Sequence, residues 1–248
     1  MKRLYEEQAY QTTVGSWWET TAKPDLWPRL KKDIRAHTLI IGGGYTGMNC
    51  ALELSRKQDP AGIVILEAQQ PGWGASGRNG GFCCMGGSKL SLKGHLKRFG
   101  ETETRKYFKA QQTSVESVRQ LLTAHDIDAD IHSRGETLMA HRAEQVAEMH
   151  NELEEMERDF AVRPELVEKK HLAENGMSSP EFHAALTTPV GFALNPMKYV
   201  AGLARLVKNN GLAAYGETPA LSVREASGHW QVSTPNGNIT AANLTIIW

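Results

Sequence analysis

The sequence has little cysteine: three in 248 residues, two of which are adjacent. So few thiols make no disulfide framework, and neighbouring cysteines rarely bridge because the ring they close is strained. Cys50 falls in a helix-favouring segment, where a small buried side chain is expected. Packing is also the expected role of Cys83 and Cys84, with a redox or covalent role as the alternative.

An excess of charge of either sign is also lacking, because 28 basic residues balance 28 acidic ones. Without a basic patch, nucleic acid is not an expected partner. The nine histidines are scattered and show no ligand spacing, so no metal site is predicted. A chain of this length is sufficient for one large domain or one and a half small ones, and 40% apolar residues are adequate for a globular core.

Long apolar runs are absent as well. The uncharged stretch 38–52 is short and interrupted by glycine, and the stretch 226–248 is rich in polar and turn residues. Neither is expected to span a bilayer. The first residues, Met1–Glu7, lack the apolar centre of a secretory signal. We therefore expect a cytoplasmic protein without a membrane partner.

What the chain does contain is a glycine-rich turn between a strand and a helix. The apolar run Thr38–Ile41 precedes it, and a helix-favouring segment follows. The turn consists of Gly42, Gly43, Gly44, Tyr45, Thr46 and Gly47. Gly42 permits the tight turn, Gly44 admits a pyrophosphate close to the main chain, and Gly47 lets the helix pack on the strand. This order of strand, G-x-G-x-x-G and helix predicts the start of a dinucleotide-binding βαβ unit.

A carboxylate follows at the distance expected for ribose binding. The apolar strand Ile63–Leu66 ends at Glu67, 20 residues after Gly47. A carboxylate in that position accepts hydrogen bonds from both hydroxyls of an adenosine ribose and repels a 2′-phosphate, which disfavours a cofactor of the NADP type. NAD and FAD both stay open on these grounds, since they share the ADP half.

A second glycine-rich run, from Gly72 to Gly81, favours FAD. Five of its ten residues are glycine, so its backbone can come close to a ligand and its N–H groups can form an anion nest. Ser76 adds a hydroxyl, Arg78 a permanent cation, and Asn79 a donor and acceptor pair. A cation near the pyrimidine side of a flavin would stabilise the reduced, anionic ring. An ordinary flexible loop is the alternative.

These segments resemble the D-amino-acid oxidase family of FAD-dependent oxidoreductases, and within it the gamma-glutamylputrescine oxidase-like branch. The resemblance rests on residues 40–47, on Leu66-Glu67-Ala68 and on residues 72–81. It extends upstream to Ser16-Trp17-Trp18 and downstream to residues 195–203, whereas residues 89–189 match only in layout.

The resemblance implies a non-covalent FAD site. The first turn would hold the pyrophosphate and Glu67 the ribose, while the second run would follow the ribityl chain and the flavin. Some relatives attach the flavin through a histidine, but the matching position here holds Arg78. Ala220 matches a residue beside the adenine. The predicted cofactor-binding residues are Gly42, Gly43, Gly44, Tyr45, Thr46, Gly47, Glu67, Ala68, Gly74, Ala75, Ser76, Arg78, Asn79, Gly80, Gly81 and Ala220.

The predicted fold is α/β, a Rossmann-like FAD-binding domain with a βαβ start and an antiparallel meander, interrupted by an inserted, incomplete α+β substrate domain. Residues 1–36 would form an N-terminal arm, with Trp17, Trp18 and Trp27 against the body of the protein. Residues 37–88 and 190–248 would form the FAD-binding domain, and residues 89–189 the first part of the substrate domain.

Periodicity and turn residues place the remaining elements. Helices are expected at 104–122, at 143–160, and from Pro196 to about 209, with a strand at 136–140. The meander would use strands 221–225, 229–233 and 238–241, and residues 244–247 would form a separate last strand.

The resemblance implies oxidation of a small-molecule amine or amino acid, with hydride transfer from the carbon that bears a neutral amine; no catalytic base is predicted. The chain stops at Trp248 in an expected central strand, so we expect the N-terminal part of a longer enzyme. A short form completed by a second chain is the alternative. A non-catalytic flavin- or ADP-binding subunit is the second functional hypothesis, and the second glycine run disfavours an NAD-dependent dehydrogenase. The sequence does not indicate which amine is used.

Overall fold

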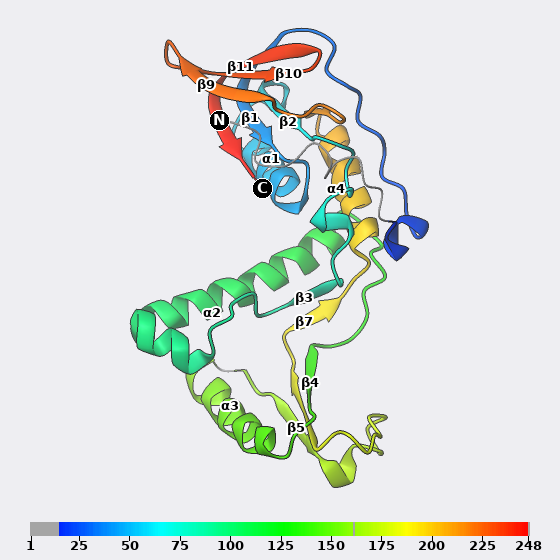
Figure 1. The fold of residues 1–248 in the computed structure, drawn as a ribbon, viewed down its shortest axis with the longest axis vertical. Coiled ribbons are helices and arrows are strands. Elements are labelled where there is room, and N and C mark those ends of the chain that lie inside the picture. Colours follow the sequence, from blue (N-terminus) through cyan, green and yellow to red (C-terminus); the bar gives the residue numbers. More distant parts are fainter. Residues whose placement is uncertain (1–14, 161, 248) are drawn as a thin grey trace. The chain divides into compact units, whose positions relative to one another are not determined.

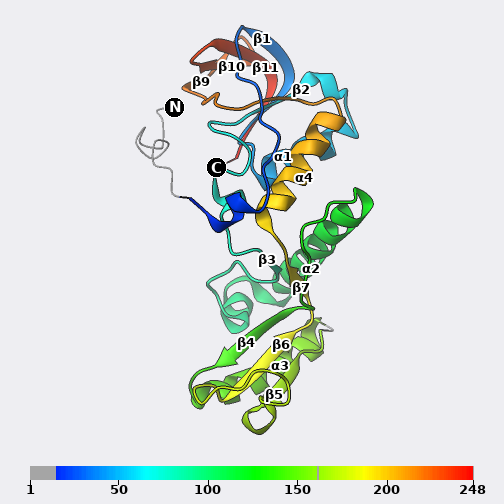
Figure 2. The same ribbon diagram turned by 90° about the vertical axis from the view of Figure 1, so that its right-hand side faces the viewer.

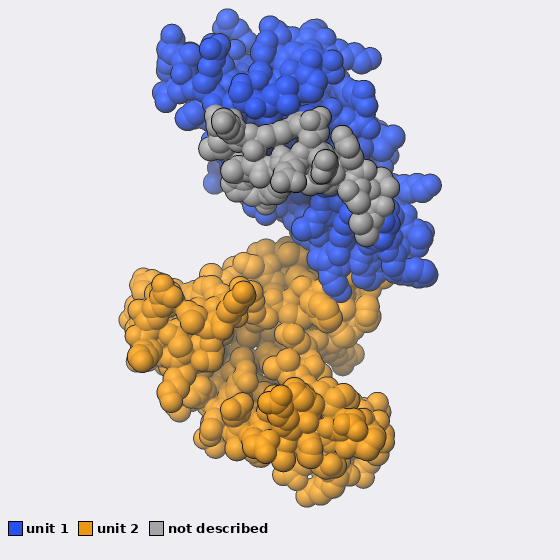
Figure 3. Space-filling model, viewed as in Figure 1, with its two compact units in different colours: residues 1–80, 127–129, 195–248 blue, residues 81–126, 130–194 orange. Residues whose placement is uncertain are grey.

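The structure is a computed structural model that describes residues 15–160 and 162–247. The first 14 residues of the predicted N-terminal arm lie outside the described residues. Two compact units can be distinguished (Figure 3). Unit 1 comprises residues 1–80, 127–129 and 195–248, and unit 2 comprises residues 81–126 and 130–194. Each unit is described by itself below.

Unit 1 is built on a six-stranded mixed sheet with the strand order β8-β2-β1-β11-β10-β9 (Figure 1). The strands are β1 (Ile34–Ile41), β2 (Ile63–Leu66), β8 (Ala213–Tyr215), β9 (Ser222–Ala226), β10 (His229–Thr234) and β11 (Gly237–Ile246). Strands β8, β2, β1 and β11 are parallel, and β10 and β9 join antiparallel as a meander. The predicted Rossmann-like sheet with its βαβ start is confirmed.

The last two predicted strands are in fact one. Strand β11 pairs antiparallel with β10 along residues 237–241 and parallel with β1 along residues 239–246. Residues 239–241 belong to both ladders, so the chain runs straight on and no turn separates 238–241 from 244–247. The same pairing extends β1, which begins at Ile34 opposite Ile239 rather than at the predicted Thr38.

The two long helices of unit 1, α1 (Tyr45–Ser55) and α4 (Pro196–Asn209), lie side by side (Figures 1 and 2). Asn195 caps α4, because its Oδ1 accepts the N–H groups of Met197 and Lys198. Successive side chains of each strand point to opposite faces of the sheet, so the two faces have different neighbours. Ile40 approaches α1 at Gly47, while the other face carries a core cluster of Leu30, Leu39, Val64, Leu66, Val232, Ile239 and Ala241.

Unit 2 contains a three-stranded antiparallel sheet of β4 (Glu136–Ala140), β6 (Ala184–Thr188) and β5 (Glu165–Glu168), in that order. Helix α3 (Glu144–Phe160) packs on it through Met149. A two-stranded ribbon, β3 (Phe82–Cys84) and β7 (Gly191–Ala193), was not predicted. Strand β4 and helix α3 match the predicted ranges to within one residue.

Helix α2 (Leu92–Ala124) starts twelve residues before the predicted 104–122 helix. Ser91 caps it, and its Oγ accepts the N–H of Gly94. Gly100 interrupts the helix with a φ of 75°, which lies in the left-handed region that glycine tolerates. The prediction missed the first segment because Gly100 separates it from the longer periodic stretch. No helix in the described part of the chain is long and apolar enough to cross a membrane.

Candidate functional site

The first glycine-rich turn joins the carboxyl end of β1 to α1. Gly42 has a φ of 114°, in the left-handed region, and its N–H donates to the carbonyl of Leu66 at 2.8 Å. Gly44 is the N-cap of α1 and has an extended backbone. A Cβ on Gly47 would lie 1.8 Å from the carbonyl oxygen of Gly42. The turn therefore excludes a side chain at position 47 and holds the N-terminus of α1 at the end of the sheet, where α/β proteins bind phosphates.

The second glycine-rich run repeats this geometry. Gly72 has a φ of 86°, Gly74 is an N-cap with φ and ψ of −81° and −160°, and a Cβ on Gly77 would lie 2.1 Å from the carbonyl oxygen of Gly72. The run opens a single 3₁₀ turn, η4 (Ala75–Gly77), instead of a long helix. The spacing G-x-G-x-x-G is visible in the sequence at both places, and aligning the two runs would have predicted the shared geometry.

Ser76 connects the two turns. Its Oγ accepts the backbone N–H of Tyr45 at 3.0 Å, and a Cβ on Gly44 would meet this oxygen at 2.8 Å. The side-chain amide of Asn79 donates to the carbonyls of Ala75 and Ser76 at 3.1 and 3.0 Å and lies 3.5 Å from the hydroxyl of Tyr45. Residues from the two runs thus form one site within unit 1.

Glu67 turns its carboxylate toward the first turn. Its Oε2 accepts the N–H of Gly43 and its Oε1 accepts the N–H of Gln69, both at 2.9 Å. A carboxylate offers about four acceptor positions, so these two bonds leave capacity for ribose hydroxyls. Ala68 follows and is half-buried. Glu67 therefore holds the first turn in place and can still accept hydrogen bonds from ribose hydroxyls.

Arg78 follows η4, and its side chain is half-buried. Its guanidinium carbon is 5.0 Å from the ring centroid of Trp73, and its Nη2 is 3.4 Å from Glu19 Oε1. Among the residues that the structure describes, Arg78 Nε is a buried side-chain nitrogen that has no hydrogen-bond partner. Such a donor points to a ligand, because buried polar groups are normally paired.

The glycine surface beside Arg78 is open. A Cβ on Gly74 would meet no atom within 4 Å. Thr46, Ala75 and Gly80 are exposed too, whereas Gly43, Gly47 and Gly77 are buried. The turns therefore have a buried inner side and an open outer side to which an anionic cofactor can come close. Together with the unpaired donor of Arg78, this arrangement fits FAD.

Two predicted residues take no part in the contacts that join the turns. Ala220 is half-buried against the core cluster that contains Leu39 and Leu66. Gly81 belongs to unit 2, where its carbonyl accepts the N–H of Leu194 at 2.9 Å. For these two residues, as for the other predicted site residues, cofactor contact stays a prediction.

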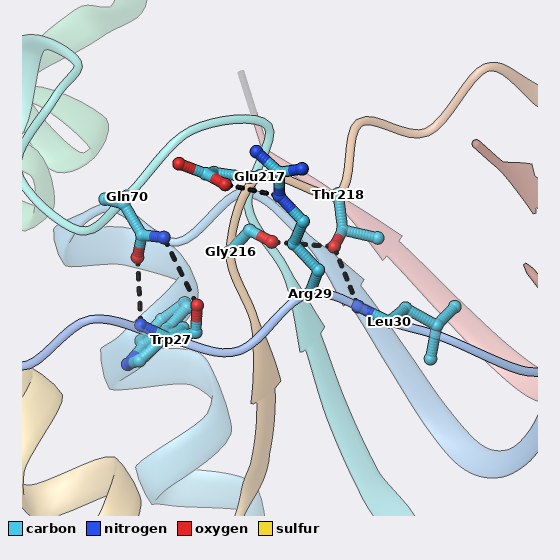
Figure 4. A network of polar contacts seen from close by, with 7 residues as sticks. All are labelled: Trp27, Arg29, Leu30, Gln70, Gly216, Glu217 and Thr218. Atoms are coloured by element: carbon cyan, nitrogen blue, oxygen red, sulfur yellow. Dashed lines mark hydrogen bonds and ion pairs between the residues drawn. The ribbon is translucent and has the colours of Figure 1, made fainter. Parts of the chain in front are cut away.

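The described part of the N-terminal arm is tied to the loops that follow β2 and β8 (Figure 4). Trp27 and Gln70 exchange two hydrogen bonds, N–H to Oε1 at 2.9 Å and Nε2 to carbonyl at 3.2 Å, and Leu30 N–H donates to Thr218 Oγ1 at 3.2 Å. Arg29 and Glu217 form an ion pair. No sequence pattern signals these contacts, because they join residues far apart in the chain.

The tryptophans of the arm differ in burial. Trp27 is 6% exposed and Trp18 is half-buried, but Trp17 is 75% exposed. The expectation that all three lie against the body is therefore wrong for Trp17. Trp17 and Trp18 are neighbours in one short 3₁₀ turn, η2 (Trp17–Thr20), and Trp18 takes the inward direction.

The adjacent cysteines lie on β3 in unit 2. Burial raises the pKa of Cys83 to about 11; the neighbouring Cys84 adds to the shift and Arg119 opposes it. Burial also raises the pKa of Cys84, with a further contribution from Glu136. Both thiols are therefore protonated at neutral pH, which favours packing over a redox role.

Comparison with known proteins identifies the protein family to which the chain belongs. Residues 37–247 match the family of FAD dependent oxidoreductases, the DAO family, and the chain belongs to it. The family predicted from the glycine motifs is confirmed, and its members use FAD. One relative is the gamma-glutamylputrescine oxidoreductase of Escherichia coli, which is 28% identical over 219 residues, covering 88% of this chain and 50% of that protein.

Solved structures show the same fold. Glycine oxidase from Geobacillus kaustophilus superimposes with a TM-score of 0.67 at 20% identity, over 86% of this chain and 55% of that one. L-amino acid deaminase from Proteus vulgaris gives a TM-score of 0.70 at 16% identity, over 91% and 49% of the two chains. The chain spans about half the length of the curated relatives it matches.

Proposed function

We propose that this chain binds FAD non-covalently and serves the oxidation of the C–N bond of a small amine or amino acid. The observation that carries the proposal is the pair of G-x-G-x-x-G turns joined by the bond from Tyr45 N–H to Ser76 Oγ. Membership of the FAD dependent oxidoreductase family supports the cofactor. The substrate class is supported by the name of the Escherichia coli relative, a gamma-glutamylputrescine oxidoreductase.

The proposal assigns each part of the site to one part of FAD. The first turn and the N-terminus of α1 hold the pyrophosphate, which their main-chain N–H groups and the helix dipole attract. Glu67 accepts the hydroxyls of the adenosine ribose, and Ala220 lies beside the adenine. Ser76, Asn79 and Gly80 follow the ribityl chain, and Arg78 supplies a cation near the flavin.

The chemistry that FAD supplies when bound is acceptance of a hydride from the carbon that bears a neutral amine; water then hydrolyses the imine, and oxygen or another acceptor takes up the two electrons. The chain's own residues bind and orient the reactants. Arg78 favours negative charge at the site. No residue is assigned as a catalytic base, because an amine that arrives unprotonated can give up its hydride directly, which leaves an iminium ion that water hydrolyses.

We also propose that the two units have different functions. Unit 1 contains the joined turns and is the cofactor-binding part. Unit 2, with its antiparallel sheet of β4, β6 and β5, is the first part of a substrate domain. The units differ from the predicted domain boundaries at three places. Residues 81–88 and 190–194, predicted in the FAD-binding domain (37–88 and 190–248), lie in unit 2, and residues 127–129, predicted in the substrate domain (89–189), lie in unit 1.

A second candidate is a flavin- or ADP-binding subunit without catalysis of its own, whose site another chain completes. This candidate is compatible with the joined turns, which account for cofactor binding and contain no residue assigned to catalysis.

The absorption spectrum of the purified chain, before and after addition of FAD, tests the proposal. Flavin bands that stay with the protein on gel filtration, and flavin that is released into the supernatant on acid precipitation, are expected. Anaerobic bleaching by amines or amino acids would establish the oxidation. Stable flavin bands that no amine bleaches would favour the subunit. Binding of a nicotinamide cofactor in place of flavin would overturn the assignment.

A further inference from the structure

We propose that the segment Ser16–Leu30 is a positioning element of the cofactor site, in which Trp18 and Glu19 hold the second glycine-rich turn in the geometry that FAD requires. This inference rests on the proposed function. The segment precedes residue 37, where the match to the family begins. It nevertheless reaches both glycine-rich turns, which lie within unit 1 as the segment does.

Trp18 holds the end of the second turn. Its indole Nε1–H donates to the carbonyl of Asn79 at 2.8 Å, across 61 residues of sequence. Asn79 in turn donates through its side chain to the carbonyls of Ala75 and Ser76. Trp18 therefore braces the residue that ties η4 together, and through Ser76 this brace extends to the first turn.

Trp18 is itself held from two sides. Its N–H donates to Ser16 Oγ at 3.3 Å, and its carbonyl accepts the N–H and the hydroxyl of Thr21 at 3.0 and 2.7 Å. Thr21 and Asn195, the N-cap of α4, share a hydrogen bond at 2.9 Å. The indole is thus presented to Asn79 by a small network that the rest of unit 1 anchors.

Glu19 acts on the charge of the same turn. Its carboxylate is 3.4 Å from Arg78 Nη2, while Trp73 covers the guanidinium at 5.0 Å. The ion pair draws the outer nitrogen of Arg78 toward the arm, and Nε stays buried without a partner. Glu19 thereby sets the direction of Arg78 and partly neutralises it.

Trp27 supports the first turn in the same manner. A Cβ on Gly43 would lie 2.7 Å from the Cζ3 atom of the Trp27 ring and 2.9 Å from Glu67 Cβ. The indole therefore packs directly on the backbone of Gly43, and the paired hydrogen bonds with Gln70 hold it there. One segment braces both turns, so their spacing depends on it.

A matched pair of variants of the full chain tests the role of Trp18. Trp18→Phe keeps an aromatic ring and removes the indole N–H, and Trp17→Phe changes the exposed neighbour. We expect the dissociation constant for FAD to rise roughly 2–10-fold in Trp18→Phe, the range for loss of one hydrogen bond, and to stay unchanged in Trp17→Phe. Far-ultraviolet circular dichroism of the apoproteins reports folding. Wild-type affinity in a folded Trp18→Phe protein overturns the role of Trp18.

The flavin midpoint potential tests Glu19 with a readout that simple packing does not move. Glu19→Gln removes the negative charge beside Arg78, so the potential is expected to rise, and Glu19→Asp is expected to stay close to wild type. In an Arg78→Ala background the same change is expected to have a much smaller effect. An equal rise in both backgrounds, or none in either, overturns the assignment of Glu19.

Failure of the proposed function gives a different result. A wild-type chain that takes up no FAD overturns the cofactor site itself. A wild-type chain that binds FAD, with Trp18→Phe and Glu19→Gln indistinguishable from it in affinity and potential, leaves the function standing and removes the arm from the site. If Trp18→Phe does not fold, the potential of Glu19→Gln decides the inference.

Discussion

Gly47 packs against the carbonyl oxygen of Gly42 so closely that a Cβ at position 47 would be 1.8 Å from that oxygen. Gly77 has the same relation to Gly72, at 2.1 Å. The two contacts show why each turn requires a glycine five residues after its first glycine. The reason is steric and independent of any ligand. Gly44 and Gly74 occupy the corresponding N-cap positions, but their surroundings differ, and this difference can be tested.

Gly47→Ala and Gly74→Ala are expected to separate folding from cofactor binding. Alanine at position 47 forces the turn apart and should lower the free energy of unfolding by roughly 1–3 kcal/mol or more. Alanine at position 74 meets open space and an extended backbone, so stability should be retained while FAD binds more weakly, since the added methyl group occupies the face offered to the cofactor. Urea denaturation and flavin titration measure the two effects. Undiminished FAD affinity in Gly74→Ala would place the cofactor elsewhere.

Gly44→Val is expected to abolish FAD binding. The branched side chain would run into Ser76 Oγ, which a Cβ already meets at 2.8 Å, and would push the two turns apart. It would also cover the main chain that approaches the pyrophosphate. Flavin content after gel filtration is the measurement. A folded Gly44→Val protein with normal flavin occupancy is incompatible with this site.

Glu67→Gln is expected to weaken FAD binding by roughly 1–3 kcal/mol, because charge-assisted hydrogen bonds to the ribose are lost. The amide has one oxygen, which can accept the N–H of either Gly43 or Gln69, while its NH2 group is a donor and faces the other N–H. The apoprotein should therefore be less stable as well. Thermal unfolding of the apoprotein and the dissociation constant for FAD should be measured together. An unchanged dissociation constant would mean that the ribose does not contact Glu67.

Arg78→Ala is expected to lower the flavin midpoint potential, since the reduced anion loses a nearby cation. The charge in a partly screened site is worth on the order of 1–4 kcal/mol. Oxidised flavin is neutral at the ring, so reduction should be affected more than binding. A spectroelectrochemical titration against wild type measures the shift. Weakened FAD binding at an unchanged potential would assign Arg78 to the pyrophosphate instead.

Cys83 is expected to resist alkylation at pH 8. With a pKa of about 11 its thiolate fraction is roughly 100-fold below that of an ordinary cysteine, so reaction with iodoacetamide should be slow and should accelerate as the pH rises toward 11. Because the folded state raises this pKa from its ordinary value of 9.0, its contribution to stability is complete below about pH 9 and is lost as the pH rises to about 11. A variant with serine at positions 50 and 84 isolates Cys83. Rapid alkylation of that folded variant at pH 8 would contradict the burial of this thiol.

Local sequence patterns determined the elements of the cofactor half. The apolar strands before Gly42 and Glu67, the spacing of the glycines and the proline at position 196 predicted β1, β2, α1 and α4, because each depends on short-range geometry. Charge and hydrogen-bonding capacity likewise pointed to Glu67 and Arg78 from the sequence alone.

Tertiary structure decided what these elements do together. The bond from Tyr45 to Ser76, the ion pair of Glu19 with Arg78 and the contact of Trp27 with Gly43 join residues that are distant in the sequence, and no periodic pattern encodes such pairs. The continuity of β11 arises in the same way, since its two ladders with β1 and β10 overlap and suppress the turn that local sequence allowed. Non-local packing selects among conformations that neighbouring residues leave open, and for that reason the joined turns and the arm that braces them became visible only in the folded chain.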